Sequence, residues 1–485
     1  MAAIAWLPWS AEAFARARTE GKPVLLSIAP SWCRFSEQMD RTSYADDGVA
    51  AIVNRSFVPI RVDADRRPDV SERYGLGGWP TTAFLTPDGQ MLGGGTFVEA
   101  SRFADVLQRV SDAYAAGRHV QARAPDRAVE VPPATEVLST PRLVEHVMST
   151  FDGDHGGFGE SPKFPHVAPV RLALQLFKDT GDEAYQHVAI TSLDAMGWGA
   201  LYDERHGGFF RYASDADWGR PNPEKLLDVN ASLLSLYVDA VETLRLARYA
   251  ERAEDLLRYI QTWLADPVDG GWAASQRADP AYYARTDADA DIQAAPPVDR
   301  TLYADWNAAM ASAALHAGRI LEDPSLSQFA IKSLERVLLL CYKPGAGVAH
   351  YVDAGVAQVR GLLDDQIAMA AANLDAFEAT GNVVYEMMAE ELALYATRTM
   401  WDGERDGFFD RSTDPRRDIG LLRQPVKPFV TNCRAARLLR RVARTSQSAE
   451  FGDYADRTLA AMATRAAAEG PLAAEYVLAV RESTQ

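Results

Sequence analysis

The pattern of apolar and polar positions changes character partway along the chain. The first part contains continuous apolar runs at 22–30, 57–65, 81–89 and 91–98, and stretches with helical spacing at 33–46 and 101–117. Short continuous apolar runs are typical of buried strands, and apolar residues three and four apart are typical of amphipathic helices. The order strand–helix–strand, then strand–strand–helix, predicts an α/β thioredoxin-like fold over residues 1–117.

The second part of the chain is predicted to be helical throughout. Residues 118–136 carry three prolines and many charges without an apolar period, which indicates a linker. From 137 to 485 nearly every segment has the helical period, with clear examples at 170–181, 230–247, 306–323 and 366–381. The predicted organisation is therefore a thioredoxin-like domain (1–117), a linker (118–136) and an all-α domain (137–485).

A short phrase recurs between the predicted helices. An acidic residue, glycines and an aromatic residue follow one another at 152–159, 203–210, 266–273 and 402–409. Such a recurrence indicates a repeat architecture, and about twelve helices fit the remaining length. This favours a closed ring of hairpins, an (α/α)6 toroid, over an open solenoid. Taken singly, each phrase is a turn in which glycine permits a positive φ and the aromatic residue plugs the core; together the turns would form one rim.

Composition and charge narrow the class of protein. The chain has 485 residues, 47% hydrophobic and 24% charged, so two or three soluble domains are expected. A net charge of −17 argues against binding to nucleic acid or to an anionic membrane. No run of apolar residues is long enough for a transmembrane helix, and the N-terminus lacks the basic region of a signal peptide. We therefore expect a cytoplasmic protein with neither nucleic-acid nor membrane partners.

The candidate chemistry of the first domain is a single thiol. In 31-SWCRFSEQM-39, Cys33 follows a strand and opens a helix, where unpaired N–H groups favour a thiolate, and Ser36 stands where a thioredoxin has its second cysteine. Without a second thiolate the site can form one mixed disulfide, with a thiol client or glutathione, but cannot complete a cycle. Trp32 and Trp79 flank the site, and Pro80 precedes the third strand, where this fold places a cis-proline.

The reactivity of Cys33 remains open at this stage, because it is as compatible with an inert thiol as with a reactive one. Cys341 and Cys433 lie in helical segments and are predicted to be small buried apolar residues. Three cysteines in so long a chain provide no disulfide framework.

An ordered series of motifs resembles a known family. The chain carries 9-WSAEAFARA-17, 22-KPVLLSI-28, 62-VDADRRPDV-70, 78-GWPTTAFLTPDG-89 and 94-GGTF-97, and then 156–165, 207–218, 224–233, 305–310, 362–365 and 378–382. This series resembles the YyaL family, which includes the spermatogenesis-associated thioredoxin-domain proteins. The chain departs from the family pattern at Ser36, at Asn222 in place of a histidine, and at a missing tyrosine near 226–231. A family lysine is also not evident near 298–307. Several such losses together indicate relaxed or altered chemistry.

What the resemblance implies for residues 137–485 is a toroid like those of six-hairpin glycoside hydrolases and N-acylglucosamine 2-epimerases, with a funnel lined by aromatics and carboxylates. Candidate ligand-binding residues by position are Lys163, Phe164, Arg211, Asp215, Trp218, Glu224, Lys225, Asp228, Asp305, Trp306, Asn307, Asp364 and Asp365. Glu224 and Asp228 are four apart and are predicted to share a helix face. Paired carboxylates could serve as acid and base on a sugar, or could be helix-packing salt bridges.

Three hypotheses remain open. The first is a redox or thiol-binding protein whose toroid binds a client or small molecule. The second is a carbohydrate-active toroid, hydrolase-like or epimerase-like, with a structural thioredoxin-like domain. The third is a non-catalytic scaffold. The sequence has no phosphate-binding loop, nucleophile elbow or metal-spaced cysteine–histidine set, so no cofactor or metal is predicted. Of its eight histidines, His155 and His206 fall in the repeated turns and are expected to face solvent.

Overall fold

The chain forms two compact units. The structure is a computed structural model that describes residues 3–117, 137–283, 295–415 and 418–482. Unit 1 comprises Met1–Val131 and Thr413–Val426, and unit 2 comprises Pro132–Ser412 and Lys427–Gln485. The predicted linker at 118–136 lies outside the described residues. Each unit is described by itself below.

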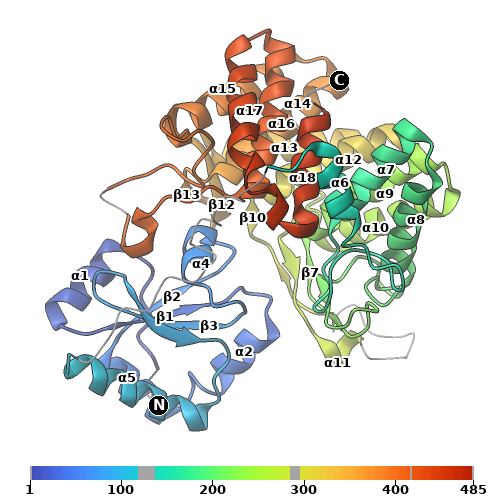
Figure 1. Ribbon diagram of the computed structural model, residues 1–485. Helices are drawn as coiled ribbons and strands as arrows, with labels where there is room; N and C mark the ends of the chain where they lie inside the picture. Colours follow the sequence, from blue (N-terminus) through green and yellow to red (C-terminus); the bar gives the residue numbers. More distant parts are fainter. Residues whose placement is uncertain (1–2, 118–136, 284–294, 416–417, 483–485) are drawn as a thin grey trace. The chain divides into compact units, whose positions relative to one another are not determined.

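Unit 1 is built on a four-stranded sheet (Figure 1). Its strands are β1 (Val24–Ile28), β2 (Val58–Val62), β3 (Thr81–Leu85) and β4 (Met91–Gly95), in the order β2-β1-β3-β4. β1 runs parallel to β2 and antiparallel to β3, and β3 and β4 form an antiparallel pair. All five residues of β1 are buried, as its continuous apolar run predicts.

Helices cover both faces of this sheet. They are α1 (Ala11–Glu20), α2 (Arg34–Arg41), α3 (Asp47–Ser56), α4 (Pro68–Tyr74) and α5 (Ala100–Ala115). Because side chains alternate along a strand, Leu26 packs with α1 and α4 on one face, whereas Leu25 packs with α3 and α5 on the other. The layers and strand order confirm the predicted thioredoxin-like fold.

A segment from late in the chain completes unit 1. Residues 413–426 contain a short 3-10 helix, η4 (Gly420–Arg423), that packs on α4 and adds Leu421 to the core on that side (Figure 1). The buried Arg73 guanidinium donates to the carbonyls of Leu421 (3.1 Å) and Gln424 (3.0 Å), and the Tyr74 hydroxyl accepts from the Leu421 N–H (2.8 Å). Nothing in the local sequence pattern marks this return to unit 1.

Unit 2 is a closed ring of helical hairpins. The inner helices are α7 (Val167–Thr180), α9 (Leu227–Leu244), α12 (Ala304–Ile320), α14 (Leu363–Thr380), α16 (Phe429–Ser446) and α18 (Ala473–Arg481). Their outer partners are α8 (Glu183–Trp198), α10 (Ala247–Tyr259), α13 (Pro324–Cys341), α15 (Val383–Met400), α17 (Ala449–Ala463) and α6 (Thr140–Met148). Each inner helix packs on the next, and α18 packs on α7, so the ring closes. This confirms the predicted (α/α)6 toroid.

Short elements connect these helices. They are β5 (Tyr212–Ala213), β6 (Pro221–Asn222), β7 (Lys225–Leu226), η2 (Ile260–Leu264), β8 (Ser275–Gln276), α11 (Pro280–Tyr283), β9 (Val298–Asp299), β10 (Leu302–Tyr303), β11 (Tyr342–Lys343), β12 (Gly347–Asp353), β13 (Val356–Arg360), η5 (Ala466–Ala468) and η6 (Gly470–Leu472). The longest, β12, pairs with β10, β11 and β13.

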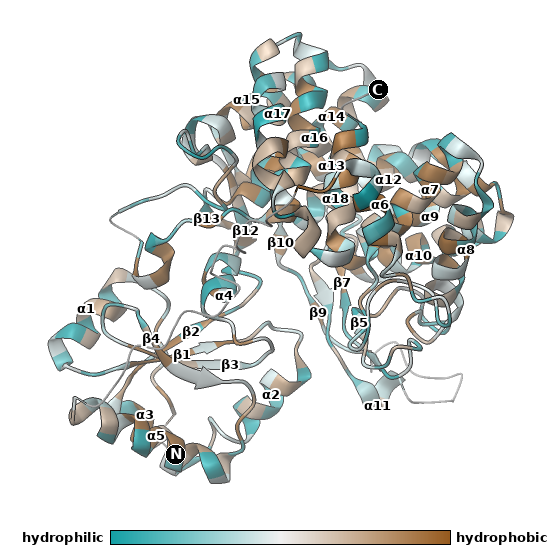
Figure 2. Cartoon of the chain, viewed as in Figure 1, coloured by the Kyte–Doolittle hydropathy of each residue, from teal (hydrophilic) through white to brown (hydrophobic). Residues whose placement is uncertain are grey.

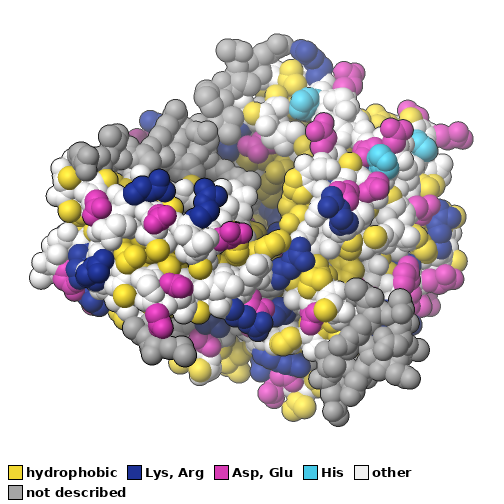
Figure 3. Space-filling view, turned by 90° about the horizontal axis from the view of Figure 1, so that it is seen from below, with side chains coloured by type: hydrophobic (Ala, Val, Ile, Leu, Met, Phe, Trp, Pro, Cys, Tyr) yellow, Lys and Arg dark blue, Asp and Glu magenta, His cyan; other side chains and the backbone are white. Residues whose placement is uncertain are grey.

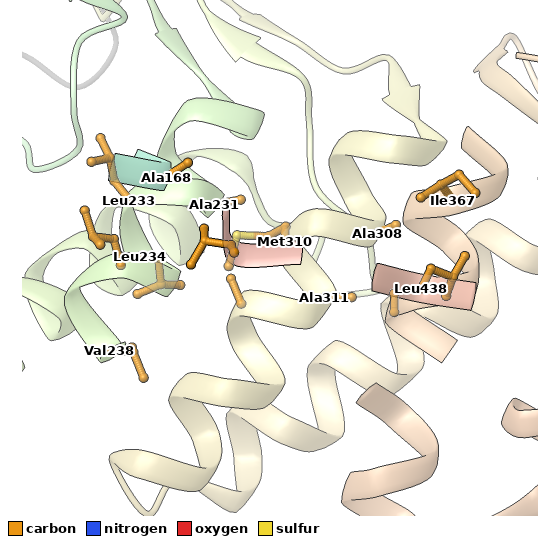
Figure 4. Packing of buried hydrophobic residues seen from close by; sticks show 14 of the residues in the cluster. Ala168, Ala231, Leu233, Leu234, Val238, Ala308, Met310, Ala311, Ile367 and Leu438 are labelled. Atoms are coloured by element: carbon orange, nitrogen blue, oxygen red, sulfur yellow. The ribbon is translucent and has the colours of Figure 1, made fainter. Parts of the chain in front are cut away.

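The core of unit 2 lies among the inner helices and between them and their outer partners. Figure 4 shows Leu234 of α9, Met310 and Ala311 of α12, and Leu438 of α16 within one apolar cluster. Many inner-helix positions hold alanine, which lets neighbouring helices approach closely. Figure 2 shows apolar and polar stretches along the same helices, as expected where one face is buried and the other meets water.

The described surface carries both charge signs. On the face shown in Figure 3, lysine and arginine side chains are interspersed with aspartate and glutamate. None of the described helices combines the length and the apolar content needed to cross a membrane.

Candidate functional site

The aspartate that opens each repeated phrase is a turn residue. Asp152, Asp203, Asp266 and Asp402 each accept backbone N–H groups two and three residues ahead through one carboxylate oxygen. Such side-chain bonds fix a turn locally. The glycine and aromatic positions follow inside the ring, where, for example, Phe209 and Trp272 are buried. The phrases are therefore structural turns.

Each turn aspartate also pairs with a cation. Its partner is Lys163 for Asp152, Lys225 for Asp203 (2.6 Å), Arg336 for Asp266 (2.9 Å) and Lys427 for Asp402 (2.7 Å). Each cation donates as well to a backbone carbonyl, such as that of Gly207 for Lys225 (2.7 Å). The side chains of Lys163 and Lys225, both candidate ligand residues, are fully buried in these pairs. Burial lowers the pKa of Lys225 to about 8, against the opposing attraction of Asp203.

A second repeated contact fixes the start of the inner helices. The side-chain amides of Asn230, Asn307, Gln366 and Asn432 accept from one backbone N–H and donate to the carbonyl of that same residue, at Phe209, Trp272, Val348 and Phe408 respectively. Each amide also donates to the carbonyl four residues before it. We call these side chains the amide hooks. Asn307, a candidate ligand residue, is one of them.

The amide hooks set three aspartates in register. Asp228, Asp305 and Asp364 each lie two residues before a hook and are the second residue of α9, α12 and α14. Because the hooks dock in the same way, these carboxyls occupy equivalent positions on three consecutive inner helices. We call the group formed by Asp228, Asp305, Asp364, Asp365 and His350 the carboxylate centre. All four aspartates were candidates from the sequence.

Two of these equivalent carboxyls have an oxygen without a partner. Within the described residues, Oδ1 of Asp228 and Oδ1 of Asp305 are buried and make no hydrogen bond, whereas Oδ1 of Asp364 accepts from the Thr431 hydroxyl (2.7 Å). Burial raises the pKa of Asp228 and of Asp364. Burial also raises the pKa of Asp305 to about 8, opposed by His350 and reinforced by Asp365. The helix N-termini favour the charged forms, so burial outweighs the helix dipoles here.

His350 and Asp365 join Asp305. His350 comes from β12, and its Nδ1 lies 2.9 Å from Oδ1 of Asp365 and 3.9 Å from Oδ1 of Asp305. The three ligand atoms lie within 4.8 Å of one another, close enough to share a small cation. Nothing in the sequence pattern singles out His350, which stands in no motif and lies 15 positions before Asp365.

Arg434 and Thr431 of α16 complete the surroundings of Asp228 and Asp364, and neither was predicted from the sequence. The Arg434 charge acts on the carboxyls of both Asp228 and Asp364. It is itself paired with Glu475 of α18 at 2.9 Å. A signal was present, since α16 begins with a hook, Asn432, and these residues flank it.

The remaining toroid candidates divide between the neighbourhood of Asp228 and the turns. Arg211 pairs with Glu224 (2.8 Å), acts on the Asp228 carboxyl and lies over Tyr212, which stacks on Phe164. The prediction that Glu224 and Asp228 share a helix face is wrong. Glu224 precedes β7, and α9 begins only at Leu227 because the Lys225–Leu226 backbone pairs with β8.

Three further candidates make local contacts. Asp215 forms an exposed ion pair with Arg220. The buried Trp218 indole donates to the carbonyl of His155 (3.1 Å) and packs against Gly157. Trp306, next to Asp305, packs on Tyr303 with 4.8 Å between ring centroids. Of these, only Trp306 adjoins the carboxylate centre in sequence.

The thiol site of unit 1 has the predicted local geometry. Cys33 is the N-cap of α2, and its thiol points to the Trp79 carbonyl (3.8 Å), with the Trp79–Pro80 bond cis as expected. The Cys33 residue is 8% exposed. Ser36, one turn into the helix, is buried, and its hydroxyl has no partner among the described residues.

Two tryptophans lie next to this thiol. The Trp32 indole donates to Asp65 (2.7 Å), and the Trp32 and Trp79 rings meet edge to face at 5.6 Å. The other two thiols are fully buried: burial raises the pKa of Cys341 to about 12 and that of Cys433 well above its ordinary value. They fit the prediction of buried apolar residues.

The two turn histidines differ from each other. His155 is exposed and lies beside Asp152, as predicted. His206 is half-buried, stacks on Tyr282 and lies within hydrogen-bonding distance of its hydroxyl (3.1 Å), so the expectation that it faces solvent is wrong.

Solved structures share the toroid fold. A cellobiose 2-epimerase from Bacillus thermoamylovorans has a TM-score of 0.54 at 11% identity, over 66% of this chain and 84% of its own. A D-mannose isomerase has a TM-score of 0.52 at 14% identity, over 66% and 85%. A glycoside hydrolase family 76 mannosidase from Bacteroides thetaiotaomicron has a TM-score of 0.51 at 11% identity, over 71% and 98%. At these identities the similarity concerns the fold alone.

Sequence relatives cover the thioredoxin-like part and beyond. Residues 1–130 match the family Thioredox_DsbH, a protein of unknown function (DUF255). Spermatogenesis-associated protein 20 of Mus musculus is 29% identical over 312 residues, and an uncharacterized protein of Caenorhabditis elegans is 29% identical over 308. The matches take in 57% of this chain but only 39% and 41% of those relatives' own lengths. Residues 1–130 therefore match a thioredoxin-domain family, and the chain is similar over part of its length to spermatogenesis-associated protein 20.

Proposed function

We propose that the toroid binds a polyhydroxylated, sugar-like ligand at the carboxylate centre. The observation that carries this proposal is the register of Asp228, Asp305 and Asp364 on consecutive inner helices, where two of their buried oxygens have no partner among the residues that the structure describes. A buried acceptor without a donor is unfavourable, and each hydroxyl group of a sugar is a donor that satisfies such an acceptor. Trp306 packs on Tyr303, whose ring lies 5.3 Å from that of His350, so aromatic side chains adjoin the centre.

The fold supports this ligand class. Proteins named as a cellobiose 2-epimerase, a D-mannose isomerase and a mannosidase share the toroid, and all three names refer to sugars. The proposal concerns binding, because fold similarity at low identity carries no reaction with it. Epimerisation or hydrolysis would be detected as product in the same ligand panel.

Calorimetric titration of the full chain with aldoses, ketoses and disaccharides tests the proposal. We expect at least one sugar to bind and Asp228→Asn to weaken that binding about tenfold or more, the effect of losing one hydrogen bond to a charged group. Asp215→Asn is the matched control, because Asp215 is acidic but lies in an exposed ion pair. Absence of binding across the panel, or equal losses in both variants, would refute it.

A second candidate function rests on the Cys33 thiol. We propose that Cys33 forms mixed disulfides with low-molecular-weight disulfides or thiol clients. Its place at the N-cap of α2, without a side-chain capping bond, puts the sulfur at the positive end of the helix dipole. The Cys33 thiolate would attack one sulfur of glutathione disulfide, form a Cys33–glutathione disulfide and release one glutathione thiolate.

Mass spectrometry after exposure to glutathione disulfide tests this candidate. One adduct on Cys33 is expected, with none on the fully buried Cys341 and Cys433. Ser36→Cys would restore a second thiol and should convert the adduct into an internal disulfide with release of glutathione. An unmodified Cys33 in the folded chain would exclude the candidate. If neither sugar nor disulfide reacts, the scaffold hypothesis remains.

A further inference from the structure

We infer that Asp305, His350 and Asp365 form a binding site for a divalent transition-metal ion, Mn²⁺ or Zn²⁺. The inference rests on the carboxylate centre proposed above to bind a sugar-like ligand and adds a cation to it. Nothing in the sequence pattern indicates this site, because its three residues come from α12, β12 and α14.

The distances fit an ion after a small closure. Ligand atoms about 2.1 Å from one ion lie no more than ~4.2 Å apart. His350 Nδ1 lies 2.9 Å from Asp365 Oδ1 and 3.9 Å from Asp305 Oδ1, and all three atoms lie within 4.8 Å. Only the two carboxylates have to approach each other.

The buried carboxylates of Asp305 and Asp365 also favour a bound cation. Asp365 is fully buried, and its Oδ2 makes no hydrogen bond to any described residue; the same holds for the buried Oδ1 of Asp305. Within the described part of the chain, no lysine or arginine pairs with either carboxylate; His350 alone does. The turn aspartates show the contrast, since each of them has a lysine or arginine partner. Two buried carboxylates without such a partner are compensated either by a proton or by a cation.

The donor types select the metal. One imidazole nitrogen with two carboxylates suits Mn²⁺ or Zn²⁺, whereas Mg²⁺ and Ca²⁺ prefer sites made only of oxygen atoms. Three protein ligands leave coordination positions open for water or for ligand hydroxyl groups. The Asp305 side chain is 20% exposed, whereas those of His350 and Asp365 are 4% and 0% exposed, so the open positions and the entry path lie on the Asp305 side.

The test uses the full chain stripped with EDTA and then titrated with Mn²⁺, Zn²⁺, Mg²⁺ or Ca²⁺. Metal analysis and calorimetry should give one Mn²⁺ or Zn²⁺ per chain and much weaker Mg²⁺ and Ca²⁺ binding. Asp365→Asn should lower the Mn²⁺ affinity by at least ~100-fold, since loss of even an outer partner lowers affinity about 10–100-fold. Because Asp365 is buried, Asp305→Asn serves as a second variant: the rise in melting temperature that Mn²⁺ gives the wild type should be absent from it.

Asp215→Asn is the control, because Asp215 is acidic but lies in an exposed ion pair with Arg220 outside the carboxylate centre. It should keep the Mn²⁺ affinity of the wild type. No bound ion, or equal affinity in Asp215→Asn, Asp305→Asn and Asp365→Asn, would overturn the site in favour of a proton shared by the carboxyls. If sugar binds to the stripped chain but no ion binds in the titration, this inference alone is overturned. One bound ion without any sugar binding would support it and refute the proposed function.

Discussion

The turns and the inner-helix starts of the toroid use aspartate for opposite purposes. In the turns, Asp152, Asp203, Asp266 and Asp402 each pair with a lysine or arginine and accept two backbone N–H groups. At the helix starts, Asp228 and Asp305 occupy equally regular positions, but each keeps a buried oxygen that has no donor in the described part of the chain. Both sets recur with the repeat and lie close together in the sequence.

The difference shows that recurrence alone does not separate structure from function. A carboxylate that pairs with a cation and accepts backbone N–H groups stabilises the fold, and its loss should destabilise the toroid. A buried carboxylate without such partners destabilises the fold, and we interpret it as retained for ligand binding. The two sets can therefore be compared experimentally by whether each carboxylate has a cation and hydrogen-bond donors as partners.

The largest effect is expected from breaking a turn pair. Lys225→Met keeps the length of the side chain but leaves Asp203, which is 8% exposed, as an unpaired buried charge. Removing one partner of a buried ion pair costs about 3–5 kcal/mol. We expect urea unfolding of the variant at neutral pH to show a loss of this size.

The control for this variant is Arg220→Met. Arg220 also pairs with an aspartate, Asp215, but its side chain is 78% exposed. An exposed pair of this kind is screened by solvent and contributes little, so the unfolding curve should hardly move. Similar losses in the two variants would mean that pairing matters without burial, and the comparison between turns and helix starts would fail.

A smaller effect follows from the pH dependence of the first turn. Burial alone would raise the pKa of Asp152, but Lys163 and the N–H groups of His155 and Asp154 outweigh it and hold the pKa at about 2, below its ordinary 3.8. A depressed carboxyl pKa stabilises the fold above the unfolded pKa, and this stability is lost as the pH falls through the folded pKa. The shift corresponds to about 2 kcal/mol.

Asp152→Asn should therefore lower the free energy of unfolding by about 2 kcal/mol at neutral pH. Its difference from the wild type should shrink between about pH 4 and pH 2. Denaturant curves at successive pH values measure this difference. A difference that stays constant through that window would show that the Lys163 pair does not set the Asp152 titration.

The fold was predictable because its signals are local and repeated. Continuous apolar runs marked all four strands of unit 1, and the phrase that recurs from 152 to 409 marked the hairpins of the toroid. The return of residues 413–426 to unit 1 could not be predicted, because it depends on Arg73 and Tyr74, more than 300 positions earlier, and on no local pattern.

The site was only partly predictable for the same reason. Asp228, Asp305 and the Asp364–Asp365 pair stand beside recognisable helix starts, so their candidacy followed from the sequence. Lys163 and Lys225 were selected on the same grounds, but their turn partners can be identified only in three dimensions. His350 reaches the site from a strand that no motif identifies. Proximity along the chain found the acidic groups, whereas pairing across the chain decided their roles.

The smallest effect, and the one opposite in sign, is expected at a helix start. Asp228→Asn removes a charge that burial disfavours without removing a cation's partner, so we expect the toroid to gain about 1 kcal/mol, the size of typical stabilising substitutions. Burial raises the pKa of Asp228, so the folded state holds this proton to higher pH than the unfolded chain does. The wild type therefore loses stability as the pH rises above the unfolded value of about 4, and the variant does not.

The gain of Asp228→Asn should accordingly be present at neutral pH and vanish in acid. The effect of Asp152→Asn is also largest at neutral pH, but it is a loss of stability. Urea unfolding at two pH values, together with the sugar titration, measures both consequences on one variant. A stabilised chain that no longer binds the ligand would mark Asp228 as retained for binding. If Asp228→Asn is instead destabilised as strongly as Lys225→Met, Asp228 belongs with the turn aspartates, and the carboxylate centre is part of the scaffold.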